Sequence, residues 1–202
     1  MRGFIFVYME NRSNIKVISS TPLSDNWGKL NKVKFNFMLS DGTWDTQVRE
    51  VYDRGNGAVI LLYNKEKGTV VLTRQLRIPT WFNGNPDGMM IEACAGTLDE
   101  DDPMECIIRE TKEETGYELT DVRKIMEVYM SPGSVTEILY FFVGSYSDAM
   151  KTGNGGGVDG EHENIEVLEM PFDMAMHMIT TGDIKDAKTI MLLQYAKING
   201  LL

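Results

Sequence analysis

The chain has 202 residues, which leaves room for one domain of ordinary size, or for one domain with a small accessory lobe. Hydrophobic residues make up 43% of it and charged residues 25%, and these proportions exclude global disorder. The 30 acidic residues outnumber the 20 basic residues, so the formal net charge is −10 at pH 7. We expect no nucleic-acid partner, because binding to nucleic acid requires a basic surface. We expect no membrane partner, because no apolar run approaches the roughly 20 residues that span a bilayer.

The two cysteines, Cys94 and Cys106, are too few for a disulfide scaffold and indicate buried thiols in a reducing compartment. We therefore expect a cytoplasmic protein. Residues 1–8 contain one charge and a short apolar stretch without a small-residue cleavage site, a pattern that does not match a signal peptide. We interpret these residues as an extension that precedes the folded chain.

Residues 9–54 are predicted to form a small antiparallel β lobe. Within it, the segment 32–37 alternates polar and apolar side chains, which is typical of a half-buried strand. The segment 40–42 reads Ser-Asp-Gly and predicts a turn, after which 43–52 returns as a second strand with charges interleaved. Near Gly55 the chain changes to continuous apolar runs, so we place the start of the main domain, 55–202, at this point.

The main domain is predicted to be α+β with a mixed sheet, because its strands and helices mostly do not alternate along the chain. The glycine-rich segment 152–164 is expected to be a loop, and 153–157 within it is interpreted as a lid or spacer. Strands are expected at 58–63, 69–73, 89–95, 123–130, 137–146 and 165–169. Helices are expected at 103–115, 171–180 and 186–198.

The segment 103–115 carries strong helix signals at both ends. Asp102 is a favourable N-cap residue, proline follows at the first helical position, and Gly116 is a natural stop. By the helical period, one side of this helix is apolar or small and is predicted to face the core. That side consists of Met104, Ile107, Ile108, Thr111 and Thr115.

Three carboxylates gather on a flank of the same helix. Glu110, Glu113 and Glu114 lie within about 100° of arc around the helix axis. Like charges at such spacings destabilise a helix by roughly 0.2–0.5 kcal/mol per pair. A hard divalent cation would remove the repulsion, because it prefers oxygen ligands. The alternative is a solvated acidic face on which Arg109 and Lys112 are partial partners.

The frame around these carboxylates resembles the Nudix box, which is usually written G-x5-E-x7-R-E-x-x-E-E-x-G followed by an aliphatic or aromatic residue. Here the matching residues are Gly96, then the run from Arg109 to Gly116, then Tyr117. Gly96 lies 13 residues before Arg109, whereas the family has 14. The family's first glutamate therefore corresponds to Asp101 counted back from the helix, or to Asp102 counted forward from the glycine. We prefer Asp101, because shortening a loop is less costly than shifting a capped helix.

The resemblance extends from about Lys16 to Leu193 and is greatest to the nucleoside-diphosphate-sugar branch of the Nudix hydrolases, in particular to its GDP-mannose hydrolases. It implies the Nudix fold, a mixed β-sheet sandwiched between helices. It also implies a homodimer in which the N-terminal β lobe is exchanged between the two subunits. The segments that carry the resemblance outside the box are 51–58, 74–77, 91–96, 131–137, 155–157 and 186–189.

The activity that the resemblance implies is hydrolysis of the pyrophosphate bond of GDP-mannose, or of a related nucleoside-diphosphate sugar, to a nucleoside monophosphate and a sugar 1-phosphate. The implied cofactor is Mg²⁺, for which Mn²⁺ could substitute. The implied metal ligands are the Ala95 carbonyl, Glu110, Glu114 and Glu163. Glu163 is also the implied catalytic base, with Glu161 as a competing candidate because the loop is two residues longer than in the family. Glu113 and Arg109 would support the site by orientation and ion pairing.

The resemblance implies substrate contacts on both sides of Gly55: Trp27, Arg49, Glu50, Arg77, Gly96, Thr97, Glu137, His162 and Lys188. Trp27 matches an aromatic residue that stacks on the base, and core packing is its alternative. The planar donor fork of Arg77 suits a phosphate. His162 stands where the family has aspartate, and for this residue a solvated loop position is the favoured interpretation. Lys188 lies at a helix start, where a cation is unfavourable, and this favours a functional role.

Two other functions remain open at this point. An ADP-ribose or ADP-sugar pyrophosphatase would use the same chemistry on another substrate. A nucleotide-sugar-sensing protein without turnover would belong to a different class. The three glutamates at 110, 113 and 114 argue against a sensor, because a protein that only binds need not keep a metal cluster.

Overall fold

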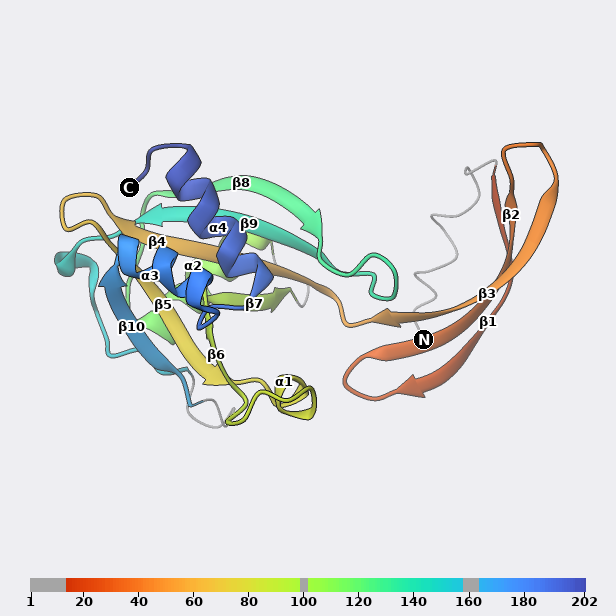
Figure 1. Cartoon of the computed structure of the whole chain (residues 1–202), viewed down its shortest axis with the longest axis horizontal. Coiled ribbons are helices and arrows are strands. Elements are labelled where there is room, and N and C mark those ends of the chain that lie inside the picture. Colours follow the sequence, from red (N-terminus) through yellow and green to blue (C-terminus); the bar gives the residue numbers. More distant parts are fainter. Residues whose placement is uncertain (1–13, 99–101, 158–163) are drawn as a thin grey trace. The chain divides into compact units, whose positions relative to one another are not determined.

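The computed structural model describes residues 14–98, 102–157 and 164–202 (Figure 1). The chain forms two compact units. The small unit comprises Met1–Gly55 with Tyr129–Glu137, and the large unit comprises Asn56–Val128 with Ile138–Leu202. The predicted extension, 1–8, lies outside the described residues.

The small unit is a three-stranded antiparallel sheet in the order β1-β2-β3, formed by Ile15–Asp25, Lys29–Met38 and Trp44–Asp53. The turn before β3 is stabilised by Asp41, whose Oδ1 accepts a hydrogen bond from the Thr43 backbone N–H at 2.9 Å. Hydrogen bonds from Thr43 lower the pKa of the Asp41 carboxyl. Near the end of β3, Tyr52 exchanges backbone hydrogen bonds with Ser134 and Thr136, which attaches the segment Tyr129–Glu137 to this sheet.

The large unit contains a seven-stranded mixed sheet in the order β10-β5-β4-β9-β8, with β6 paired to β5 and β7 paired to β4. The β4–β9 pair is parallel, whereas β4 pairs antiparallel with β5 and β7, and β5 pairs antiparallel with β6 and β10. The strands are β4 Asn56–Asn64, β5 Thr69–Leu76, β6 Met89–Glu92, β7 Ala95–Leu98, β8 Val122–Tyr129, β9 Ile138–Ser145 and β10 Glu166–Pro171.

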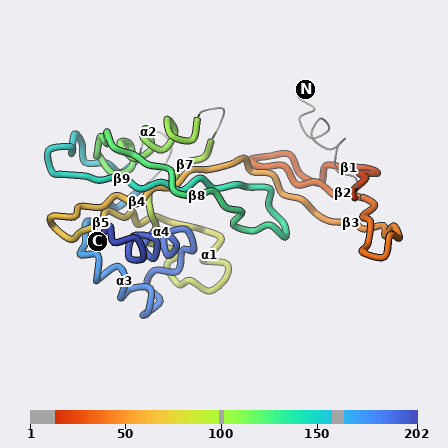
Figure 2. The backbone as a smooth tube through the Cα atoms, turned by 90° about the horizontal axis from the view of Figure 1, so that it is seen from above, coloured from red at the N-terminus to blue at the C-terminus, as the bar shows by residue number. Residues whose placement is uncertain are grey.

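Helices cover both faces of this sheet. Figure 2 shows α2 on one side of the strands and α3 and α4 on the other. The predicted α+β class, with a mixed sheet between helices and a small antiparallel β lobe, is thereby confirmed. None of the described helices has the length and apolar character needed to cross a membrane. The helices are α1 Ile78–Phe82, α2 Pro103–Thr115, α3 Phe172–Thr181 and α4 Ala187–Ile198, with a 3₁₀ turn at Asp148–Met150.

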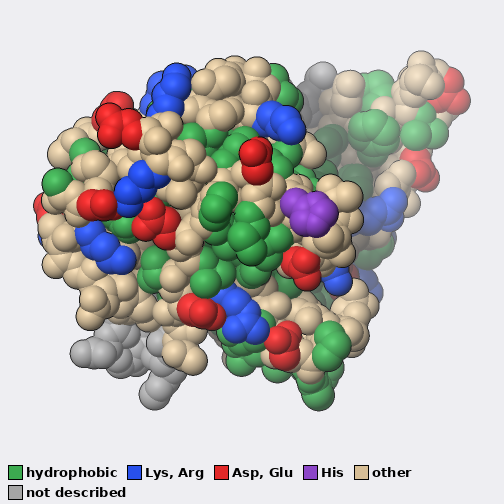
Figure 3. All heavy atoms as spheres, turned by 60° about the vertical axis from the view of Figure 1, so that its left-hand side comes forward, with side chains coloured by type: hydrophobic (Ala, Val, Ile, Leu, Met, Phe, Trp, Pro, Cys, Tyr) green, Lys and Arg blue, Asp and Glu red, His purple; other side chains and the backbone are tan. Residues whose placement is uncertain are grey.

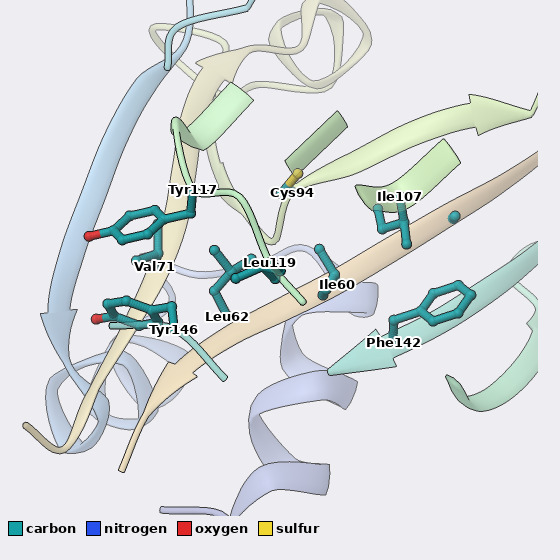
Figure 4. Close-up of a cluster of buried hydrophobic side chains, with 10 residues drawn as sticks. Ile60, Leu62, Val71, Cys94, Ile107, Tyr117, Leu119, Phe142 and Tyr146 are labelled. Atoms are coloured by element: carbon teal, nitrogen blue, oxygen red, sulfur yellow. The ribbon is translucent and has the colours of Figure 1, made fainter. Parts of the chain in front are cut away.

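The core of the large unit is built around β4. The run from Ala58 to Leu62 is fully buried, because β4 is a central strand with packed side chains on both faces. Figure 4 shows Ile60 and Leu62 of this strand among side chains from β5, α2 and β9. The apolar surface that these residues remove from water is the main stabilising contribution to the unit.

One predicted strand is wrong in its extent. The segment 89–95 was expected to be a single strand ending at Gly96, but the structure contains two strands, β6 and β7. The chain leaves β5 after Glu92 and joins β4 at Ala95, and between them Cys94 O accepts a hydrogen bond from Ile60 N at 3.0 Å. The change of partner depends on the tertiary arrangement and leaves no local sequence signal. Strand β1 and helix α1 were not among the expected elements either.

Candidate functional site

Helix α2 has the bounds and caps that the sequence predicts. Asp102 Oδ1 accepts a hydrogen bond from the Met104 backbone N–H at 2.8 Å, and Gly116 ends the helix in the left-handed conformation with φ 78°. Of the predicted core side, Ile107, Thr111 and Thr115 are buried, whereas Met104 and Ile108 are half-buried. Asp102 therefore serves as a cap, and Asp101, its competitor for the first box position, lies outside the described residues.

The carboxylate of Glu110 lies directly against the backbone of β7. A Cβ added to Gly96 would meet Glu110 Cγ at 2.3 Å, Cδ at 2.5 Å and Oε1 at 2.7 Å. Only glycine leaves room for the carboxylate at this position. On the same strand, the Thr97 carbonyl accepts a hydrogen bond from the Cys106 thiol of α2 at 3.6 Å, which ties β7 to the helix.

Glu114, one turn further along α2, is also turned toward this segment. It is only 4% exposed, and it acts on the thiol of Cys94, two residues before Gly96. Burial, and next the negative charge of Glu114, raise the pKa of the Cys94 thiol well above its usual value. The thiol therefore stays neutral, and it can donate a hydrogen bond to the carboxylate without competing with it for positive charge.

Arg109 joins two of the three helix carboxylates. Its Nη1 lies 3.0 Å from Glu110 Oε1 and 3.1 Å from Glu113 Oε2. The guanidinium offsets the repulsion between carboxylates that the sequence pattern implies. Glu113 is thus turned to Arg109 on the outer side of the helix, while Glu110 and Glu114 face the segment 94–96. This placement accords with a supporting role for both Arg109 and Glu113.

The donor chemistry at this place fits a hard divalent cation. Glu110 and Glu114 offer carboxylate oxygens, and the neighbouring Ala95 offers a carbonyl oxygen, which are the ligand types that Mg²⁺ prefers. Among the described residues, no three His, Cys, Asp or Glu side chains are grouped closely enough to hold a metal ion by themselves. The predicted loop residues Glu161, His162 and Glu163 lie outside the described part of the chain.

The glycine-rich segment that precedes this loop is packed on the end of α2. Gly156 N–H donates to the Glu114 carbonyl at 2.9 Å, and Gly157 N–H donates to the Glu113 carbonyl at 3.2 Å. A Cβ at Gly155 would lie 2.3 Å from the Glu114 carbonyl oxygen, so the close approach requires glycine. The segment 153–157, interpreted from the sequence as a lid or spacer, is thus packed on the end of α2 in this structure. The segment satisfies the carbonyl groups at the end of the helix that carries the carboxylates.

Arg77 and Lys188, two predicted phosphate or sugar contacts, converge on one buried carboxylate. Glu92 Oε2 accepts from Arg77 Nε at 2.6 Å, and Glu92 Oε1 accepts from Lys188 Nζ at 2.5 Å. Lys188 also contacts Asp186, the N-cap of α4, at 2.8 Å. Of the predicted substrate residues of the large unit that the structure describes, Gly96 and Thr97 lie in the segment 92–97, and Arg77 and Lys188 contact it through Glu92.

In the small unit, Trp27 and Glu137 are connected through Arg54. Trp27 is 75% exposed, so its alternative reading as a core residue does not hold within this unit. The Arg54 guanidinium lies 5.1 Å from the centre of a Trp27 ring, and its Nε lies 3.5 Å from Glu137 Oε1. An exposed indole backed by a guanidinium is a suitable platform for stacking a base.

Arg49 and Glu50, the other two predicted contacts of the small unit, are not brought together. They are consecutive on β3, opposite Val33 and Lys32 of β2, so their side chains lie on opposite faces of the sheet. Arg49 donates to the Gln47 side chain at 3.0 Å on its own face. Glu50 therefore faces the side of the sheet opposite to Arg49.

Two residues that hold the predicted substrate contacts together were not predicted from the sequence: Glu92, between Arg77 and Lys188, and Arg54, between Trp27 and Glu137. Glu92 is a lone charged residue in an otherwise apolar strand, and that isolation is the one sequence signal that could have singled it out. Arg54 lies between β3 and β4 in a segment with no such signal. Both act by contacts with residues distant in sequence, which a pattern of neighbours does not encode.

Comparisons with known proteins match nearly the whole chain. The family model described as the NUDIX domain matches residues 53–193, and the model described as the GDP-mannose pyrophosphatase NudK N-terminal domain matches residues 14–52. A GDP-mannose pyrophosphatase from Yersinia enterocolitica is 57% identical over 188 residues, which cover 93% of this chain and 97% of that protein. One from Klebsiella pneumoniae subsp. pneumoniae is 54% identical over 189 residues, 94% of each chain.

A GDP-mannose pyrophosphatase from Escherichia coli is 52% identical over 188 residues, which cover 93% of this chain and 97% of that protein. These matches include the helix of carboxylates, the segment 92–97 and the small β unit. The chain belongs to the NUDIX family, and within it to the group that carries the NudK-type N-terminal domain.

Proposed function

We propose that this protein hydrolyses the pyrophosphate bond of GDP-mannose, or of a closely related nucleoside-diphosphate sugar, with the aid of Mg²⁺. The products are a nucleoside monophosphate and a sugar 1-phosphate. The observation that carries the proposal is the placement of Glu110 and Glu114 against the segment 94–96, in a chain whose relatives at 52–57% identity are GDP-mannose pyrophosphatases.

The reaction adds water across the P–O–P bridge. The water oxygen forms a bond to one phosphorus, the bond from that phosphorus to the bridging oxygen breaks, and the bridging oxygen leaves with the other phosphate. A bound divalent ion supplies positive charge that neutralises the diphosphate and lowers the pKa of coordinated water. Glu110, Glu114 and the Ala95 carbonyl are the proposed ligands for such an ion, and Mn²⁺ is the proposed substitute for Mg²⁺.

The remaining groups orient the reactants and move a proton. Glu163 is the proposed fourth metal ligand and the proposed base that takes the proton from water, with Glu161 as its competitor. Arg109 holds Glu110 and Glu113 in place through its two ion pairs. The exposed fork of Arg77 is suited to a phosphate oxygen. The other proposed substrate contacts are Trp27, Arg49, Glu50, Gly96, Thr97, Glu137, His162 and Lys188.

A homodimer that exchanges the β lobe is the proposed assembly. In support, the described buried hydrophobic residues lie in the large unit, whereas the three-stranded sheet exposes a set of large apolar side chains. A small sheet without a covered face is not stable by itself in water. A second copy of the chain would supply the cover. We further propose a cytoplasmic location, in keeping with two buried free thiols.

Turnover of a substrate panel tests the proposed function. GDP-mannose, ADP-ribose and ADP-glucose are each incubated with the protein and Mg²⁺, and the products are identified by chromatography. We expect GMP and mannose 1-phosphate from GDP-mannose, at a kcat/KM above those of the two adenine substrates. A preference for ADP-ribose would keep the chemistry and contradict the substrate assignment. Tight binding of nucleotide sugar without turnover would identify a sensor instead of an enzyme.

A further inference from the structure

The carboxylate of Glu92 is a buried charged group in contact with two of the proposed substrate-binding residues. Glu92 is 4% exposed, and its two oxygens accept hydrogen bonds from different cations, Arg77 at 2.6 Å and Lys188 at 2.5 Å. A buried carboxylate requires such partners to remain ionised. The carboxylate also keeps Arg77 and Lys188, two positive groups that would repel each other, close together on its two oxygens.

The two cations keep hydrogen-bond donors that Glu92 does not use. Arg77 uses Nε for Glu92, and its terminal nitrogens have no hydrogen-bond partner among the described residues. Its side chain is 41% exposed, so this fork is open to solvent. Lys188 donates to Glu92 and Asp186, which leaves the third proton of its ammonium group for another acceptor. The cluster therefore offers oriented donors from two positive groups.

Next to Glu92, one buried hydrogen bond between distant parts of the chain continues into the cap of α4. Ala93 N–H donates to Thr189 Oγ1 at 2.7 Å, and Thr189 Oγ1 donates to Asp186 Oδ2 at 2.5 Å. Asp186 in turn caps α4 through the Thr189 backbone N–H at 2.9 Å. The end of β6 and the start of α4 are thus joined at the point where Glu92 and Lys188 meet.

Glu92 is also connected along the backbone to the carboxylates of α2. Gly96, over which Glu110 lies, is four positions further along the chain, so the two Cα atoms are at most about 14 Å apart. A nucleoside-diphosphate sugar is long enough to contact both places at once. The cation pair and the proposed metal ligands can therefore act on the same bound molecule.

We propose that Glu92 is a positioning residue, which holds Arg77 and Lys188 side by side so that their remaining donors together bind the diphosphate that links the two halves of the substrate. The inference rests on the proposed function, because it takes its substrate class from there. Glu92 makes no contact with the substrate in this account. Its effect passes through the two cations, and it acts on substrate binding more than on the chemical step.

Glu92→Gln is the first test, because glutamine keeps the size of the side chain and removes its charge. The two cations contact different oxygens of the carboxylate, so the amide oxygen of glutamine replaces one acceptor, and the amide N–H₂, which only donates, is turned to the other cation. We expect KM for GDP-mannose to rise at least about tenfold while kcat stays within about threefold of wild type, the pattern of lost binding. Circular dichroism and thermal unfolding report whether the variant is folded.

Glu169→Gln is the matched control. Glu169 on β10 likewise accepts from a lysine, Lys67 at 3.3 Å, and from Tyr146 at 3.0 Å, but it lies outside the proposed site. We expect it to lower thermal stability without changing KM. A Glu92→Gln variant that loses stability as Glu169→Gln does, with KM within twofold of wild type, would overturn the positioning role. A fall in kcat at unchanged KM would overturn it as well.

A second variant and a second measurement keep the inference separate from the proposed function. If Glu92→Gln does not fold, Glu92→Asp replaces it as the test variant. Aspartate keeps the charge but is one methylene too short to hold both cations. We again expect KM for GDP-mannose to rise at least about tenfold. If wild type does not hydrolyse GDP-mannose, the proposed function fails. Calorimetric binding of GDP-mannose with Mg²⁺ then decides: tenfold weaker binding by the variant supports positioning, and equal binding or no wild-type binding contradicts it.

Discussion

Glycine at position 96 is what lets a carboxylate of α2 reach the backbone of β7. The atoms that a Cβ would meet at 2.3–2.7 Å belong to the flexible end of Glu110, so the fold can adapt by moving that side chain. Gly96→Ala is therefore expected to displace the Glu110 carboxylate and to lower kcat at least about tenfold, with the free energy of unfolding changed by less than about 1 kcal/mol. Steady-state kinetics and urea unfolding measure the two quantities.

Gly133→Ala is the matched control for this substitution. A Cβ at Gly133 meets nothing within 4 Å, so neither activity nor stability should change. If Gly96→Ala is as active as wild type, the close approach of Glu110 to β7 has no role in the reaction.

The carboxylate of Glu114 is buried. Burying a charged group costs free energy unless the charge is paired or binds a metal ion. Glu114→Gln keeps the shape and removes the charge that the proposed metal ion requires. We expect kcat to fall at least about 100-fold with the fold retained, the scale on which loss of a major charge-stabilising group acts. Glu118→Gln, which removes an exposed carboxylate paired with Lys112, should retain full activity. A folded Glu114→Gln variant with wild-type turnover would remove Glu114 from the metal site.

At the level of elements, the end of α2 and the glycine segment that packs on it form one junction. Gly116 has φ 78°, and a Cβ there would lie 2.2 Å from the Gly153 carbonyl oxygen. Because that oxygen belongs to the backbone, it cannot move as a side chain can. Gly116→Ala is expected to reduce the free energy of unfolding through both the backbone conformation and the clash, as measured by urea unfolding.

Gly182→Ala separates these two contributions. Gly182 ends α3 with φ 80°, but a Cβ there meets only Lys185 Cε at 3.5 Å. We expect a loss of about 1 kcal/mol for this control from the backbone conformation alone. Gly116→Ala should cost about 2 kcal/mol more than that. Equal losses in the two variants would mean that the junction yields to the added methyl group.

Elements with local signals were predictable from the sequence, and elements defined by their partners were not. Asp102, Pro103 and Gly116 set the bounds of α2, because caps act within a few residues of the helix end. The division of 89–98 into β6 and β7 depends on which strand lies alongside, and it was missed for that reason.

The same contrast holds for the site. The carboxylates on α2 could be predicted because their spacing places them on one flank. The period of a strand likewise places Arg49 and Glu50 on opposite faces, and here the sequence prediction did not apply that rule. The ion pairs of Glu92 join residues 15 and 96 positions apart, and no local pattern could reveal them.

At the scale of the whole molecule, the surface seen in Figure 3 differs in composition from the surface of the small unit. On the face of the protein seen in Figure 3, acidic and basic side chains are interspersed around a small group of hydrophobic side chains. Such mixed surfaces keep a protein soluble in spite of a large net charge. Among the described residues, the small unit, by contrast, exposes large apolar side chains on its strands and beside them: Ile18, Leu23, Trp27, Phe37, Leu39, Trp44 and Val48.

This exposure leads to a prediction about assembly. Deletion of residues 1–50 is expected to abolish dimerisation, because it removes the sheet that the second copy is proposed to cover. Size-exclusion chromatography with light scattering gives the mass of the full chain and of the truncated chain. A truncated chain that remains dimeric and active would exclude the exchanged lobe, and a monomeric full-length protein would exclude the dimer altogether.

Turnover of GDP-mannose by the wild-type protein, with Mg²⁺ and after its removal by a chelator, decides whether the carboxylates of α2 serve a metal-dependent hydrolase. We expect GMP and mannose 1-phosphate when Mg²⁺ is present, no turnover after chelation, and recovery when Mg²⁺ is restored. Turnover that continues after chelation would contradict the role assigned to Glu110 and Glu114. Binding of GDP-mannose without any hydrolysis in the presence of Mg²⁺ would contradict the enzyme assignment itself.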